Sequence, residues 1–307
     1  MSDAHDELLE ELRPAAFAIG YRMLGSVAEA EDVVQESLLR LHTALERGER
    51  IESPRAYVAT VATRVSIDVL RSARVRRERY VGEWLPEPLV TDSSEDPARH
   101  AETADSLSLA FLVLLESLSP EQRAVFLLHD VFDYGYREVA EIVGTSEANA
   151  RQLAARARRH VEERRPRFEA SRKQRDELAH RFFAAAQEGD VAALEALLAD
   201  DVVLHGDGGG KAPALARALF GRRRVARTLG AWFRQGARIP GADLRELGVN
   251  GQPGALMLGG DNGVIGVMAL DIADGRIQGV KSIVNPDKLG HLGEVGNLGA
   301  LLRGLTP

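Results

Sequence analysis

The sequence predicts a multi-domain protein in which two all-α domains, a helical bundle and a helix-turn-helix unit, precede a C-terminal α+β domain. Three observations lead to this fold class. Apolar residues recur at helical spacing through about the first half of the chain. Within that half, residues 136–161 have the pattern of two short helices joined by a tight turn. After about residue 200 the pattern changes to short strands, and Ala273-Asp274-Gly275 is typical of a hairpin turn. Helices followed by antiparallel strands indicate a separate α+β domain.

Length and composition limit the class of protein. The chain has 307 residues, which is enough for two or three domains with their own cores. It has no cysteine, which excludes disulfides and thiolate metal sites. The acidic N-terminus lacks the basic-then-apolar order of a signal peptide, and the longest apolar run, residues 107–115, is too short to span a bilayer. We therefore expect a cytoplasmic protein with no membrane association, no metal and no cofactor.

The net charge of −7 argues against a nucleic-acid partner, but the distribution of charge does not. Arginines gather in residues 71–79 and 151–167, whereas acidic residues gather in 3–11, 29–36 and 83–102. Such a chain can contact DNA with one surface and a protein with another. We expect weak intrinsic DNA affinity unless a partner supplies the rest.

Three helices are predicted at the N-terminus. The first covers residues 6–24 and the second residues 28–47. The third begins at Ser53-Pro54, with Ser as N-cap and Pro at the first helical position, and runs to about Arg77. The residues expected on its buried side are Val58, Val61, Val65 and Val69.

Two exposed faces of these helices are candidate binding sites. Asp32, Gln35 and Glu36 on the second helix could pair with basic groups of a protein partner, although a solvated helix face is the alternative. The third helix carries aromatic and basic residues that suit an opened DNA strand, where bases stack and phosphates are held. A basic helix end favoured by the macrodipole is the alternative there. The DNA candidates are Tyr57, Thr60, Arg64, Arg71 and Arg74.

A linker is expected over residues 80–104, which hold three prolines and little periodicity. It contains the apolar string Trp84-Leu85-Pro86-Glu87-Pro88, whose prolines favour an extended conformation and so lower the entropy cost of docking. A helix over residues 105–118 follows. Ser119-Pro120-Glu121-Gln122 then has the form of a capping box at the start of another helix.

The helix-turn-helix pattern turns at Gly144-Thr145-Ser146, where either hydroxyl can cap the second helix. Opposite its apolar stripe the second helix carries Asn, Gln and Arg. Asn and Gln can pair with adenine and Arg with guanine, while further arginines hold phosphates. An amphipathic helix with a solvated basic face is the alternative. The candidate DNA-reading residues are Asn149, Arg151, Gln152, Arg156 and Arg159.

The C-terminal domain is expected to combine three helices with five strands. The helices are 176–187, 190–198 and 221–234, and the strands are 201–205, 244–250, 254–258, 264–272 and 276–284. His205 and Asp207 lie at the end of the first of these strands. A lone histidine there is more often structural, and we expect no enzymatic activity.

Three segments together resemble the extracytoplasmic-function sigma factors of bacteria. Residues 28–36 are similar to the acidic core-binding helix of that family, and Ser53-Pro54-Arg55-Ala56-Tyr57 with the following arginines to its −10 element helix. Residues 118–123 with the helix-turn-helix are similar to its −35-reading domain. The resemblance covers residues 6–167. It implies a promoter-specificity subunit whose partners are promoter DNA and the β′ and β subunits of RNA polymerase core.

The last third of the chain resembles a SnoaL-like domain, a cone of helices around a curved antiparallel sheet. Two strings, Asp207-Gly208-Gly209-Gly210-Lys211 and Asn285-Pro286-Asp287-Lys288-Leu289, resemble signatures of sigma factors with such a domain fused to them. The resemblance leads to the hypothesis of regulation in cis, in which the linker docks on both strings. The residues assigned to this contact are Trp84, Leu85, Pro86, Asp207, Gly208, Gly209, Gly210, Lys211, Asn285, Pro286, Asp287 and Lys288.

The resulting domain boundaries are 1–79, 80–104, 105–167 and 168–307. We expect a monomer when free, with a small ligand of unspecified identity as a further partner of the C-terminal domain. Two other functions stay open at this point. One is a helix-turn-helix regulator that acts without polymerase, and the other is a ligand-sensing or enzymatic SnoaL-like protein.

Overall fold

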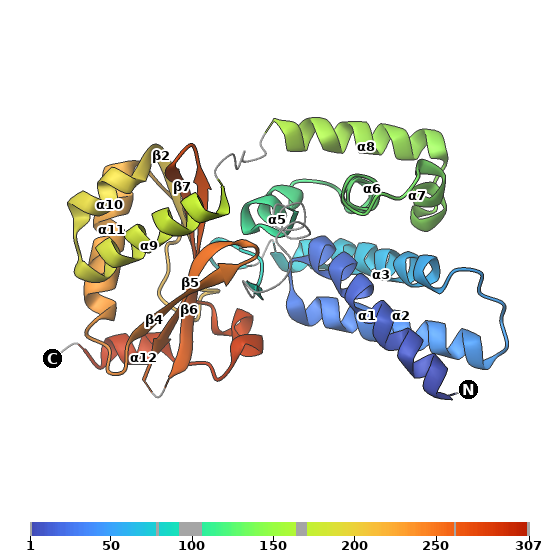
Figure 1. The fold of residues 1–307 in the computed structure, drawn as a ribbon, viewed down its shortest axis with the longest axis horizontal. Coiled ribbons are helices and arrows are strands. Elements are labelled where there is room, and N and C mark those ends of the chain that lie inside the picture. The colour runs from blue at the N-terminus through green and yellow to red at the C-terminus, as the bar shows by residue number, and fades with distance from the viewer. Residues whose placement is uncertain (1, 78–79, 92–105, 164–170, 261, 306–307) are drawn as a thin grey trace. The chain divides into compact units, whose positions relative to one another are not determined.

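The computed structural model describes residues 2–77, 80–91, 106–163, 171–260 and 262–305 (Figure 1). It divides into two compact units. The first combines Met1–Glu78 with Leu112–Arg165, and the second combines Arg79–Phe111 with Pro166–Pro307. The segment that leads from the N-terminal helices to the helix-turn-helix region therefore belongs to the same unit as the C-terminal domain.

The first unit begins with the three expected helices, α1 (Ser2–Leu24), α2 (Val27–Glu46) and α3 (Pro54–Arg77). Ser26 caps α2, because its side chain accepts a hydrogen bond from the Glu29 amide. Of the apolar residues expected to be buried on α3, Val58 and Val61 are buried, whereas Val65 and Val69 are half-buried. Burial extends further around α3 than one stripe, because α3 packs on α1 and α2 and also on later helices of the same unit.

The rest of the first unit is the helix-turn-helix region. The capping box at Ser119 starts α6 (Pro120–Phe126), which continues into a π-helical turn, η1 (Leu127–Val131). Two helices follow, α7 (Tyr136–Val143) and α8 (Glu147–Glu162). Gly144 ends α7 in the left-handed region with φ 75°, and Ser146 caps α8 by accepting from the Asn149 amide. The helix expected over 105–118 is shorter, α5 (Leu109–Leu115), and residue 105 lies outside the described residues.

The second unit holds a sheet in which seven strands are described, in the order β1-β4-β5-β6-β7-β2-β3. All neighbours pair antiparallel except β2 and β7, which are parallel. The strands are β1 (Val90–Thr91), β2 (Leu198–Asp207), β3 (Leu219–Phe220), β4 (Asp243–Val249), β5 (Gln252–Gly259), β6 (Gly263–Ala273) and β7 (Arg276–Ile283). The predicted fold class, two all-α regions followed by an α+β domain, is confirmed.

Three helices cover one face of this sheet (Figure 1). They are α9 (Arg172–Glu188), α10 (Val191–Leu197) and α11 (Arg222–Gly236). Phe182 and Phe183 of α9 meet Leu270 and Val280 of the sheet in the main core of the unit. After β7 the chain forms two 3-10 turns, η2 (Pro286–Lys288) and η3 (Gly290–Leu292), and a short helix, α12 (Leu298–Arg303). Neither α12 nor β3 was expected, since each is too short to show periodicity.

The predicted linker is not irregular throughout. Its residues Val90 and Thr91 form β1, the edge strand that pairs with Val249 and Gly248 of β4. The Asn250 amide also donates to the Leu89 carbonyl at 2.8 Å, which continues the pairing. A two-residue strand is too short for the alternation by which strands are recognised. The remaining linker residues, 92–104, lie outside the described part of the chain.

Candidate functional sites

The acidic face of α2 is exposed. Asp32 and Gln35 are exposed, and the half-buried Glu36 forms an ion pair with Arg40 at 2.6 Å. Leu39 follows on the same side, one helical turn after Gln35, and 60% of its surface is exposed. Leu39 is therefore a large exposed apolar side chain next to the carboxylates of this face. Sequence reasoning missed Leu39, although its place outside the apolar stripe of α2 was a usable signal.

Several DNA candidates on α3 make contacts inside the first unit. Arg64 donates from Nε to the Ile142 carbonyl and from Nη2 to the Glu141 carbonyl, both at 2.9 Å. It therefore caps the C-terminal carbonyls of α7, where a cation is favoured. Arg71 pairs with Glu121 at 2.9 Å, and this hydrogen bond and the charge of Glu121 raise the pKa of the Arg71 guanidinium.

The other candidates on α3 differ in accessibility. Tyr57 is half-buried against the core of the three N-terminal helices. Thr60 is also half-buried and donates its hydroxyl hydrogen to the Ala56 carbonyl at 2.8 Å. The side chain of Arg74 lies outside the described residues.

A buried arginine joins the two helical regions of the first unit. Arg123 is 2% exposed and donates to the Met23 carbonyl at 2.6 Å and to the Leu115 carbonyl at 2.7 Å. It also pairs with Glu116 at 2.8 Å. Burial lowers the pKa of Arg123 to about 9. Sequence reasoning placed Arg123 within a motif but assigned it no role.

All five DNA-reading candidates on α8 are exposed. Asn149 donates from its side chain to the Thr145 hydroxyl at 2.7 Å, and Arg151 pairs with Glu147 and lies 4.5 Å from the centre of the Tyr136 ring. Gln152, Arg156 and Arg159 project on the same side. The opposite side is made of small buried side chains, Ala150, Ala154, Ala157 and Val161, which let α8 pack closely on α6.

In the second unit, Asp207 is the centre of a contact between the linker and the C-terminal domain. Its carboxylate is fully buried at the end of β2. Oδ1 accepts from the Tyr80 hydroxyl at 2.5 Å and from the Gly209 amide at 3.1 Å. Oδ2 accepts from the Leu85 amide at 2.8 Å and from Lys288 Nζ at 2.7 Å. Both oxygens are thus held by protein donors, and the charge is paired.

Lys288 supplies the cation of this contact. Its ammonium is buried and also donates to the Leu85 carbonyl. It lies 4.3 Å from the ring centre of Trp84 and 5.0 Å from that of Tyr80, which are cation–π distances. Residues 80–85 therefore wrap around one buried ammonium. We call the set Tyr80, Trp84, Leu85, Asp207, Asn285 and Lys288 the linker clamp.

The glycine-rich string makes room for the clamp. Gly209 has φ 58°, and a Cβ there would lie 2.3 Å from Nδ2 of Asn285. That amide donates to the Tyr80 hydroxyl at 2.7 Å. The phenol is half-buried, and burial together with its hydrogen bond to Asp207 raises the pKa of Tyr80 above its ordinary value. At the surface, Lys211 and Asp287 form an exposed ion pair at 2.6 Å that joins the two strings.

Further contacts extend the clamp along the linker. Glu83 accepts from His205 Nδ1 at 2.6 Å, and the Pro88 carbonyl lies 2.7 Å from His291 Nε2. The Leu89 amide donates to the side chain of Asn250 at 2.9 Å. Of the residues missed from the sequence, Asn250 had a signal, because Asn-Gly between two strands is typical of a tight hairpin turn. Tyr80, Glu83 and His291 had none.

The contacts of His205 and Asp207 limit what either residue could do as a general acid or base. His205 is occupied by Glu83, and Asp207 has no exposed surface, so neither residue is placed to exchange a proton with a substrate. In the part of the chain that the structure describes, no group of three His, Asp or Glu side chains could hold a metal ion. Among the described helices none is long and apolar enough to cross a membrane.

Comparison with known proteins adds the family context. Residues 8–76 match the family Sigma-70 region 2, and residues 108–161 match Sigma-70, region 4. The chain is 41% identical over 288 residues to the ECF RNA polymerase sigma factor SigJ of Mycobacterium tuberculosis, covering 91% of each chain. It is 33% identical over 276 residues to the probable ECF RNA polymerase sigma factor SigI of that species, covering 89% of this chain and 91% of the relative. The crystal structure of SigJ superposes with a TM-score of 0.73 and 37% identity, covering 92% of this chain and 98% of that one.

Proposed function

Because the chain belongs to the extracytoplasmic-function sigma factors, which confer promoter recognition on bacterial RNA polymerase, we propose that its C-terminal domain regulates this activity in cis through the linker clamp. The observation that carries the proposal is the buried Asp207–Lys288 pair with residues 80–85 folded around it. The same chain segment connects the two promoter-reading regions. Holding that segment on the C-terminal domain therefore changes how far apart those regions can move.

The exposed faces of the helical unit receive the following roles in this proposal. The acidic face of α2 binds polymerase core, to which the β′ and β subunits contribute, and Leu39 adds apolar contact area to the charged pairs. The basic face of α3 holds the −10 element and α8 reads the −35 element. The residue assignments stay predictions: Asp32, Gln35 and Glu36 for core, Tyr57, Thr60, Arg64, Arg71 and Arg74 for the −10 element, and Asn149, Arg151, Gln152, Arg156 and Arg159 for the −35 element.

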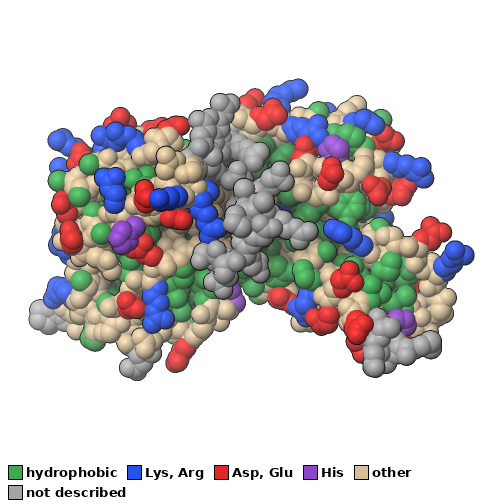
Figure 2. Space-filling model, in the orientation of Figure 1, with side chains coloured by type: hydrophobic (Ala, Val, Ile, Leu, Met, Phe, Trp, Pro, Cys, Tyr) green, Lys and Arg blue, Asp and Glu red, His purple; other side chains and the backbone are tan. Residues whose placement is uncertain are grey.

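The contacts of α3 imply that the described arrangement is a resting one. Arg64 and Arg71 are bound by α7 and by Glu121, so they reach DNA only after α3 separates from these groups. Acidic and basic side chains are interspersed over the visible face of the helical unit (Figure 2). Because DNA affinity depends on neutralised phosphates, such a surface supports weak binding by the free protein. Polymerase core is the partner expected to separate the two regions.

The length of the linker determines how strongly its docking can limit the distance between the two promoter-reading regions. The predicted boundaries, 1–79, 80–104, 105–167 and 168–307, are supported by the family matches and are kept as part of the proposal. Residues 80–91 provide about 40 Å of chain when extended. Elements centred near −10 and −35 lie about 85 Å apart along B-DNA, at about 3.4 Å per base pair. Releasing or holding residues 80–91 therefore alters a large fraction of the distance to be spanned.

The experiment is run-off transcription with bacterial core polymerase on DNA upstream of the chain's own gene. Full-length protein is compared with Lys288→Met, which breaks the clamp, and with Lys211→Met, which removes only the exposed pair with Asp287. We expect transcript yield to change with the first variant and to stay unchanged with the second. Equal yields from all three proteins would overturn regulation through the clamp and leave promoter recognition intact.

A gel-shift experiment distinguishes the sigma-factor function from a helix-turn-helix regulator that acts without polymerase. If the free protein bound the promoter as tightly as the protein–core complex at physiological salt, the helix-turn-helix would act without polymerase. We expect the free protein to bind the promoter much more weakly than the complex with core does. The enzymatic alternative has no supporting observation, because His205 and Asp207 are both engaged by the linker and its neighbours.

A further inference from the structure

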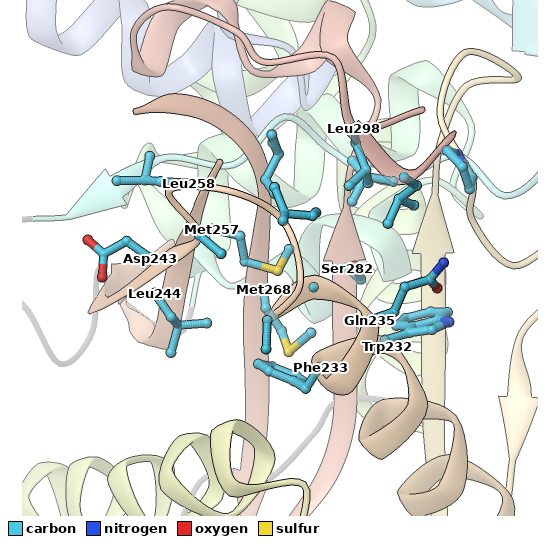
Figure 3. A pocket seen from close by; sticks show the side chains of 18 of the residues that line it. Trp232, Phe233, Gln235, Asp243, Leu244, Met257, Leu258, Met268, Ser282 and Leu298 are labelled. Carbon is cyan, nitrogen blue, oxygen red and sulfur yellow. The ribbon is translucent and has the colours of Figure 1, made fainter. Parts of the chain in front are cut away.

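The C-terminal domain contains a cavity of about 410 Å³ on the helix-covered side of its sheet (Figure 3). Residues of α11 form one wall and residues of β4, β5 and β6 form another. Leu298 and Leu302 of α12 close part of it. The volume falls in the range of sites that hold small organic molecules.

The lining is apolar and adaptable. Figure 3 shows Met257 and Met268 between Leu244 on one side and Trp232 on the other, with Phe233 nearby. Methionine side chains rearrange easily, so such a wall can fit irregular apolar ligands. An aromatic pair from α11 adds flat contact area. These groups favour a ligand that is mainly hydrocarbon or aromatic.

Charge is nearly absent from the cavity. Among the described residues that line the cavity, only Asp243 is ionisable, and it is exposed and already paired with Arg245 at 3.0 Å. Gln235 and Ser282 supply hydrogen-bonding groups. A ligand with a net charge would lose its hydration without gaining a counter-charge, which is costly. The chemistry therefore selects an uncharged molecule with one or two polar atoms.

The cavity wall and the linker clamp share a stretch of backbone. Gly206 lines the cavity and directly precedes Asp207, and Val284 lines it and directly precedes Asn285. The amides of Val284 and Asn285 both donate to the Asp207 carbonyl, at 2.8 and 3.0 Å. Ala214 lines the cavity from the loop that begins with the glycine-rich string. A movement of the Asp207 backbone therefore displaces both the linker clamp on one side of the sheet and the cavity wall on the other.

From these observations we infer that the cavity binds an uncharged, mainly apolar small molecule and that binding favours the docked linker. Release of the linker would free Asp207 and loosen Gly206 and Val284, which complete the wall. A ligand that needs the complete wall binds the docked form more tightly and increases its population. The consequence for transcription rests on the proposed function, but ligand binding and its link to the linker do not.

The test uses full-length protein and two fluorescent probes with the same ring skeleton. N-phenyl-1-naphthylamine is uncharged, whereas 1-anilinonaphthalene-8-sulfonate carries a sulfonate. We expect saturable one-site binding of the uncharged probe and at least tenfold weaker binding of the anionic one. Ala237→Trp fills the cavity mouth and should weaken the uncharged probe at least tenfold. Ala231→Trp, an exposed position on α11 outside the lining, is the matched control and should leave affinity unchanged.

Hydrogen exchange at the Leu85 amide measures the link, because this amide donates to Asp207. Saturation with N-phenyl-1-naphthylamine should slow its exchange at least fivefold in the native protein and not in the Ala237→Trp variant. Absence of saturable binding, or equal binding by both tryptophan variants, would overturn the site. Equal or tighter binding of the sulfonate would overturn the ligand class. Unchanged exchange at saturation would overturn the link. None of these results depends on transcription, so each leaves the proposed function to its own test.

Discussion

Replacing Lys288 by methionine should release the linker while leaving both units folded. Methionine keeps most of the length of the lysine side chain but removes its charge and its donors. Lys288 is 5% exposed, Asp207 is fully buried, and Nζ of the lysine lies 2.7 Å from Oδ2 of the carboxylate. Removing one member of such a buried pair costs about 3–5 kcal/mol, because the other charge is left uncompensated. The Lys288 contacts with Leu85 and Trp84 are lost at the same time.

That free-energy cost destabilises the docked state of the linker. Because the Leu85 amide is protected only in the docked state, the cost predicts a change in its exchange rate. At about 1.4 kcal/mol per tenfold, a loss of 3–5 kcal/mol lowers the docked-to-released ratio by two to three and a half orders of magnitude. Hydrogen exchange of the Leu85 amide, followed by mass spectrometry, should accelerate by the same factor until the amide is fully released. Exchange in the cores of the two units should change little.

The matched control is Lys211→Met. Its ion pair with Asp287 is more than half exposed on both sides, and exposed pairs contribute about 1 kcal/mol or less. Leu85 exchange should therefore stay within about fivefold of the native rate. If Lys288→Met also stayed within that range, the buried pair would not hold the linker, and the reasoning from burial and distance would be wrong.

Four further predictions concern single residues. Arg123→Met should lower the free energy of unfolding of the helical unit by about 3–5 kcal/mol, measured by urea denaturation, because a buried guanidinium loses its ion pair with the half-buried Glu116 and two hydrogen bonds to buried carbonyls. The folded-state pKa of Tyr80 is raised above its unfolded value, so the stabilisation of the docked linker by the Tyr80 phenol is complete below about pH 10 and is lost as the pH rises towards the folded-state pKa. Exchange of the Leu85 amide, corrected for its intrinsic pH dependence, should therefore accelerate over this pH range in the native protein. The Tyr80→Phe variant should show no such acceleration. Gly209→Ala should destabilise the clamp by about 1–2 kcal/mol from its positive φ alone, and by more from the clash with Asn285, seen as faster exchange of the same amide. Gln152→Ala should weaken binding of the polymerase complex to its own −35 sequence by about 1–3 kcal/mol and not to a −35 sequence changed at the contacted base, measured by competition binding.

Helix caps, turns and strands could be predicted from the sequence because they depend on residues that are neighbours in the chain. The capping box at Ser119, the cap at Ser146 and the turn at Gly144 all formed as their residue types require. The exposed face of α8 followed from the alternation of alanine and polar residues at helical period. The predicted strands of the C-terminal domain were all found, with ends that shifted by a few residues.

Buried polar contacts between residues far apart in the chain could not be predicted from the sequence. Tyr80 and Asp207 are 127 positions apart, and nothing in the residues around Tyr80 indicates a buried phenol. On α3 the expected stripe was too narrow, because burial by a second set of helices leaves no periodic signal. Arg64 and Arg71 were predicted to contact the −10 element, but their contacts with α7 and Glu121 depend on how the helices pack.

The sequence by itself determined the family, the order of the helical regions, the α+β character of the last third and the three strings that meet in the clamp. Each of these depends on residue type and spacing over short stretches. Only the tertiary structure decided that both carboxylate oxygens of Asp207 are held by protein donors, that Lys288 is its cation, and that a cavity lies across the sheet from both. The physical reason is that burial, pairing and cavity shape arise when strands and loops from distant parts of the chain close around one another. The free energy of those contacts belongs to pairs of residues that no local pattern brings together.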